Sequence, residues 1–137
     1  MIYFETGSPE HDLRAADLRE GLLTALRRLG DRRKVLAIPP DYTRFPSRAG
    51  ELTEMVWEYY GESLTDILPA LGTHSPMSDP QISHMFGKTP RSLFRDHDWR
   101  NDVLTLGYVP GEFVREVSEG AVDYPWPAQV NKLLVEG

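Results

Sequence analysis

The sequence contains no cysteine, and this absence excludes several kinds of chemistry at once. A chain without cysteine has no disulfides, no thiolate nucleophile and no zinc site with cysteine ligands. No apolar run approaches the roughly 20 residues that a membrane-spanning helix needs. Glu5 also stands where a signal peptide would have its apolar region. We therefore expect a soluble cytoplasmic protein without a membrane partner.

An excess of positive charge is also missing. The 137 residues carry a formal net charge of −6, which argues against a general electrostatic interaction with nucleic acid. One dense basic cluster is formed by Arg27, Arg28, Arg32, Arg33 and Lys34. It follows a predicted helix, where positive charge complements the helix dipole, and we interpret it as structural rather than RNA-binding. We expect no nucleic-acid partner.

The spacing of the apolar residues predicts an α/β fold. A chain of this length fits one domain with a sizeable core. Alternating strands and helices favour a Rossmann-like layered domain with a mostly parallel sheet flanked by helices. The alternating residues 112–117, with a return over 122–124, predict a C-terminal β-hairpin. Further strands are expected at 2–6, 34–38, 64–71 and 103–106, and helices at 13–29, 47–60 and 78–86.

A polar loop follows the strand predicted at 34–38. Pro39 and Pro40 end this strand, because proline lacks the N–H that a sheet ladder needs. Asp41, Thr43 and Arg44 then lie at the carboxyl end of a strand, close to the start of the next helix, where α/β proteins bind ligands. These side chains could hold a phosphate or a carboxylate. Alternatively, the first two cap a turn and the arginine is solvated.

A second loop, 72–77, follows the next predicted strand and contains His74. If the two strands are adjacent and parallel, His74 faces the same cleft as Arg44. An imidazole can exchange a proton near neutral pH, and a guanidinium can bind a carboxylate through two hydrogen bonds. A structural histidine remains the alternative. We interpret His84 as a half-exposed helical residue and His97 as a loop brace, and we predict no metal-ligand set.

At these loops the chain resembles the N-terminal part of the lactate racemase family, whose enzymes use a nickel-pincer nucleotide. The resemblance rests on the octapeptides at 39–46 and 70–77, on His97 and Asp98 before a strand ending in Gly107, and on the segments 111–120 and 123–134. It covers nearly everything from residue 33 onward. It implies a racemase or epimerase that moves the Cα hydride of a 2-hydroxy acid to the cofactor and returns it to the opposite face.

The resemblance also implies roles for single residues. Asp41, Tyr42, Thr43 and Arg44 match the family's cofactor-binding loop, and Arg44 is also placed to bind the substrate carboxylate. His74 matches one of two histidines that act as general acid and base on the substrate hydroxyl. The family's second histidine, its cofactor-anchoring lysine and its nickel-ligating histidine belong to sequence that follows the matched part.

Because the matched part of the family does not include these three residues, further expectations follow. Residues 1–137 are expected to be the N-terminal part of a lactate racemase-like catalytic domain, inactive alone and lacking the nickel-pincer nucleotide, with the C-terminal part of the same polypeptide as its partner. Trp126, Val130, Leu133 and Leu134 are expected to pack against sequence that follows, and in its absence we expect either self-association through this end or disorder of the last residues. The alternative functions are a non-catalytic nucleotide- or phosphate-binding module and a purely structural domain.

Overall fold

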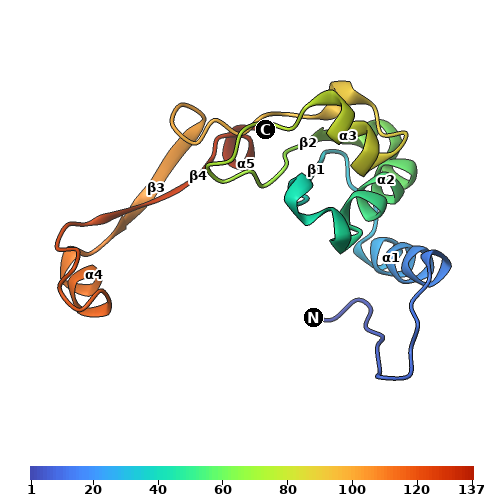
Figure 1. The fold of residues 1–137 in the computed structure, drawn as a ribbon, viewed down its shortest axis with the longest axis horizontal. Coiled ribbons are helices and arrows are strands. Elements are labelled where there is room, and N and C mark those ends of the chain that lie inside the picture. The colour runs from blue at the N-terminus through green and yellow to red at the C-terminus, as the bar shows by residue number, and fades with distance from the viewer. The chain divides into compact units, whose positions relative to one another are not determined.

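The computed structural model describes residues 1–137, which form two compact units, Met1–Asp96 and His97–Gly137. Unit 1 contains helices, 3-10 helices and a parallel pair of strands, whereas unit 2 is built on an antiparallel pair (Figure 1). In unit 1 the elements are α1 (Ala15–Leu29), β1 (Val35–Ala37), η1 (Tyr42–Ser47), α2 (Ala49–Tyr60), η2 (Gly61–Ser63), β2 (Leu64–Ile67), α3 (Asp79–Phe86) and η3 (Arg91–Leu93). In unit 2 they are β3 (Val103–Val109), α4 (Gly111–Val117), β4 (Trp126–Asn131) and α5 (Leu133–Glu136).

Local sequence signals account for the helix ends in unit 1. Helix α1 ends at Gly30, which adopts φ 74° and donates its N–H to the carbonyls of Leu26 and Arg27. Helix α3 begins after Ser78, whose backbone N–H donates to Gln81 Oε1 over 2.9 Å. This contact stabilises the start of the helix predicted at 78–86, because Gln81 satisfies a donor that the helix itself leaves free.

The parallel pair β1–β2 continues beyond its regular strands. Leu68 N–H donates to Ala37 O over 2.9 Å, and Ala70 N–H donates to Pro39 O over 2.8 Å. Pro40 and Ala70 then face each other as an isolated bridge. A proline can accept such bonds although it cannot donate one. The two chain segments therefore leave the sheet side by side, as the sequence predicts for adjacent parallel strands.

The hydrophobic core lies between this sheet and helices α2 and α3. Phe86 and Phe94 meet edge to face, with ring centroids 4.9 Å apart. Helix α2 comes so close to α3 that a Cβ on Gly50 would lie 1.9 Å from Met85 O, so only glycine fits there. The buried core consists of Leu64, Ile67, Leu71, Met77, Ile82, Met85, Phe86 and Phe94.

The mixed α/β fold with a parallel sheet and a C-terminal antiparallel hairpin confirms the predicted fold class. Several assignments within it are wrong. Residues 2–6 form no strand, and 112–117 form helix α4 instead of a hairpin strand. The hairpin is made by β3 and β4, so residues 103–105 pair antiparallel with 129–131 rather than joining the parallel sheet, and the register shifts between Thr105 and Gly107. Phe113 and Val117 also fit a helical spacing, which explains the error at α4.

The start of helix α2 also differs from the prediction. Ser47 is the last residue of η1, and Arg48 precedes α2 with a left-handed backbone at φ 61°. The Arg48 guanidinium donates two hydrogen bonds to the Glu51 carboxylate, at 2.8 and 3.1 Å, and these bonds help to stabilise the left-handed backbone of Arg48. The predicted strand 64–71 is shorter than expected and ends at Ile67.

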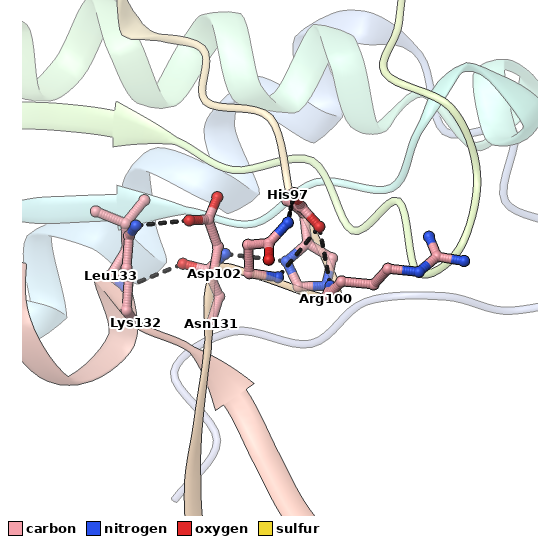
Figure 2. Close-up of polar contacts among 8 residues, drawn as sticks. His97, Arg100, Asp102, Asn131, Lys132 and Leu133 are labelled. Carbon is pink, nitrogen blue, oxygen red and sulfur yellow. Dashed lines mark hydrogen bonds and ion pairs between the residues drawn. The ribbon is translucent and has the colours of Figure 1, made fainter.

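Polar contacts hold together the base of unit 2 (Figure 2). The Asn131 amide donates to His97 Nδ1 over 2.9 Å, and Lys132 Nζ lies 2.5 Å from Asp102 Oδ1. Asn131 is buried, and its Oδ1 accepts the Leu133 N–H over 2.9 Å. His97 thus braces a loop, in agreement with the sequence interpretation. Among all the helices of the chain, none combines the length and apolar character needed to cross a membrane.

Candidate functional site

The loops that follow β1 and β2 meet at Asp41. This residue comes directly after the Pro40 bridge, and only 5% of its surface is exposed. Its Oδ1 accepts the Thr43 N–H over 3.0 Å and also the Thr43 hydroxyl proton. Asp41 therefore caps η1, which agrees with the turn-capping alternative for this residue.

The other carboxylate oxygen of Asp41 binds the histidine of the second loop. A turn closed by the His74 N–H and Leu71 O, at 3.0 Å, brings this side chain back toward β1. His74 Nδ1 lies 2.5 Å from Asp41 Oδ2, while 60% of the His74 side chain remains exposed. The imidazole is thus anchored on one nitrogen and open to solvent on the other side.

Hydrogen bonding keeps the Asp41 carboxyl ionised. The Thr43 hydroxyl lowers the pKa of Asp41 most strongly; burial acts in the opposite direction, and the His74 hydrogen bond lowers the pKa further. An ionised carboxylate only accepts hydrogen bonds, so His74 Nδ1 carries the donated proton. In the neutral imidazole this leaves a lone pair on Nε2, the nitrogen that faces away from Asp41, and such a nitrogen can act as a proton acceptor.

A small hollow opens beside this pair. Its volume is about 160 Å³, well below the size of a site that encloses a large ligand. Both loops and the first turn of α3 contribute to it, so it is formed only when the two strand ends are adjacent. Its lining residues are Asp41, Tyr42, Thr43, His74, Ser75, Met77 and Gln81.

An aromatic contact attaches η1 to α3 next to this hollow. The Tyr42 hydroxyl lies 2.7 Å from His84 Nδ1, and the Phe45 ring stacks on the His84 ring with centroids 4.6 Å apart. The sequence interpretation treated His84 only as a helical surface residue. No local spacing could reveal its role, because its partners are on a distant loop.

Arg44 is placed differently from its neighbours. Its backbone N–H donates to Asp41 O over 3.0 Å, but its guanidinium is exposed and makes no hydrogen bond or ion pair in the described chain. It does not line the hollow. The structure therefore gathers Asp41, Tyr42, Thr43 and His74 around one hollow and leaves Arg44 outside it.

The predicted proximity to a helix start needs correction. Residues 41–44 lie at the start of η1, whereas α2 begins only at Ala49. The free N–H groups of α2 are thus separated from Asp41 by a whole 3-10 helix. The described chain also contains no group of three or more histidine, aspartate or glutamate side chains that could hold a metal ion.

No family model and no curated protein matches this chain. Among solved structures, a crystal structure of a protein from Thermotoga maritima matches 90% of the chain with 30% sequence identity and a TM-score of 0.76. The lactate racemase apoprotein from Thermoanaerobacterium thermosaccharolyticum matches 94% with 23% identity and a TM-score of 0.51. The chain spans 31% of the first protein and 27% of the second. It thus shares its fold with part of a lactate racemase.

Proposed function

We propose that this chain is a racemase-related domain, part of an isomerase that acts on small 2-hydroxy acids. The fold similarity to a lactate racemase and the two loop motifs point to this reaction class. The observation that carries the proposal is the Asp41–His74 pair, 2.5 Å apart beside a hollow of about 160 Å³. In this arrangement a buried carboxylate orients an exposed imidazole, an arrangement that can serve general-base catalysis.

His74 is proposed to move the hydroxyl proton of the substrate. The proton passes from the hydroxyl oxygen to Nε2, and the resulting imidazolium is stabilised by the ionised Asp41 at Nδ1. The return of this proton restores the hydroxyl. Arg44 is proposed to bind the substrate carboxylate through its exposed guanidinium, because a planar guanidinium can donate two parallel hydrogen bonds to a carboxylate.

The nickel-pincer nucleotide fits these residues poorly. The hydroxyl and N–H of Thr43 both donate to Asp41, and the Tyr42 hydroxyl is occupied by His84, so the loop offers few free polar atoms to a cofactor. The hollow is also small for a nucleotide. The cofactor remains a prediction from the sequence resemblance. Inversion also needs a group that takes the Cα hydride as the hydroxyl proton moves to His74 and returns that hydride to the opposite face.

The alternative of a phosphate-binding module is less favoured. The Asp41 carboxylate lies at the start of η1 and has a lowered pKa, so it carries negative charge where a phosphate would have to bind. Two anions at one helix end repel each other.

The proposal is tested by NMR titration of the intact chain with lactate and with propionate, which lacks the hydroxyl. We expect lactate to bind more tightly and to shift the His74 ring signals. His74→Gln should weaken lactate binding by about tenfold, the effect of losing one hydrogen bond of about 1.4 kcal/mol. His11→Gln, a change at an exposed histidine of the N-terminal segment, is the matched control and should leave lactate binding unchanged. Equal binding of the two acids, or an unaltered affinity in His74→Gln, would refute the proposal.

A further inference from the structure

Unit 2 has no hydrophobic core of its own. Every buried apolar side chain of the protein belongs to unit 1, and the only buried residue of unit 2 is the polar Asn131. An isolated two-stranded ribbon is at best marginally stable in water. The ribbon is closed at its base by the His97–Asn131 and Asp102–Lys132 contacts (Figure 2), and α4 lies at its opposite end (Figure 1).

The end of the ribbon around α4, residues 108–126, is here termed the ribbon tip. Five of its large apolar side chains are at least half exposed, whereas Val109, Val114 and Val122 are partly buried. The rings of Tyr124 and Trp126 stack with centroids 6.0 Å apart, and Phe113 and Val117 share one face of α4. They are exposed side chains of the kind that proteins use to bind other proteins, whereas Tyr108, which pairs with Pro127, lies on the ribbon face opposite to Trp126.

The ribbon tip is also acidic. Its carboxylates are Glu112, Glu116, Glu119 and Asp123, and Arg115 is its only base. None of these groups forms an ion pair in the described chain. The apolar side chains are therefore surrounded by unneutralised negative charge, which selects a partner with positive charge.

The opposite charge occurs in unit 1 of the same protein. The basic cluster Arg27, Arg28, Arg32, Arg33 and Lys34 is exposed and forms no ion pair. Its side-chain hydrogen bonds go to the carbonyls of Tyr3 and Asp31. The helix dipole explains the arginines of the last turn of α1, but the other three residues lie beyond the helix.

We propose that the ribbon tip of one copy docks on the basic cluster of a second copy. Each copy carries both halves of this contact, so the assembly is head-to-tail and either closes into a ring or extends as a chain. Docking removes the tip's apolar side chains from water while its carboxylates meet guanidinium groups. A symmetric pairing of two tips would instead bring like charges together.

The test is sedimentation velocity of the intact chain at several protein and salt concentrations. We expect concentration-dependent assembly that weakens about tenfold or more between about 0.05 M and 0.5 M NaCl, because salt screens exposed charges. The tip-reversed variant Glu112→Lys/Glu116→Lys and the cluster-reversed variant Arg32→Glu/Arg33→Glu should each remain monomeric. Far-UV circular dichroism confirms that both variants are folded.

Mixing the two reversed variants provides the decisive measurement. The reversed tip of one variant is complementary to the reversed cluster of the other, so an equimolar mixture should form a 1:1 complex. Glu10→Lys/Glu62→Lys changes the charge equally outside the tip and should assemble like the unchanged chain. A monomer at all concentrations, no complex in the mixture, or salt-insensitive dimers lost only in Phe113→Ser/Trp126→Ser would overturn the proposal.

Discussion

Replacing Asp41 tests whether one carboxylate holds both loops together. Asp41→Ala removes the cap of η1 and the hydrogen-bond partners of Thr43 and His74. We therefore expect this single substitution at the edge of the core to destabilise unit 1. Glu58→Ala is the matched control, since it removes a carboxylate whose ion pair with Arg19 is exposed on both sides.

The expected size of the effect follows from these contacts. Loss of a helix cap costs about 1 kcal/mol, and loss of the charged bond to the Thr43 hydroxyl costs about 1 kcal/mol more. The bond to His74 adds only about 0.5 kcal/mol, because this imidazole is largely solvated. Asp41→Ala should thus lower the free energy of unfolding by about 2–3 kcal/mol, and Glu58→Ala by about 0.5 kcal/mol or less.

Urea unfolding at several pH values, followed by far-UV circular dichroism, measures both quantities. The pKa of Asp41 is lower in the folded protein than its ordinary value of 3.8, so its ionised form stabilises the fold above that pH. This contribution disappears as the pH falls from 3.8 through the lower folded pKa. The difference between the unchanged chain and Asp41→Ala should therefore be full at neutral pH and shrink in acid. A neutral-pH difference below about 0.5 kcal/mol would refute this reasoning.

Two further predictions concern packing and the base of unit 2. Gly50→Ala should destabilise the chain by about 2 kcal/mol or more in urea unfolding, because its Cβ would collide with Met85 O. The control Gly107→Ala has no atom near its Cβ and should cost less than about 1 kcal/mol. Equal effects of the two substitutions would contradict the close approach of α2 and α3. Asn131→Ala leaves the Leu133 N–H without its partner and should expose the amides of β3 and β4 to faster hydrogen exchange. Gln129→Ala, which removes an exposed bond to Thr105, should leave that exchange nearly unchanged.

Much of unit 1 could be predicted from local signals. Pro39 and Pro40 indicate the end of a strand, and Ser78 with Gln81 marks the start of α3, because caps and prolines act on their immediate neighbours. The adjacency of the loops containing Asp41 and His74 was also predicted, since parallel strands end at the same edge of a sheet. The hydrogen bond between these two side chains was not predicted, because it depends on the conformation of both loops.

The wrong secondary-structure assignments lie where the apolar residues are compatible with more than one structure. The segment 112–117 satisfies both an alternating and a helical pattern, and the structure resolves it as α4. Residues 103–106 are apolar enough for a buried parallel strand, yet they pair antiparallel with β4. Short apolar runs do not specify their partners, so such pairings are decided by the whole chain.

The sequence by itself determined the fold class, the two polar loops and the unequal distribution of charge, because these follow from residue type and spacing. Only the tertiary structure decided that Asp41 orients His74, that His84 attaches to Tyr42 and that Arg44 lies outside the hollow. The reason is physical: hydrogen bonds form within about 3 Å, and residues far apart in sequence reach that distance only after the strands have paired.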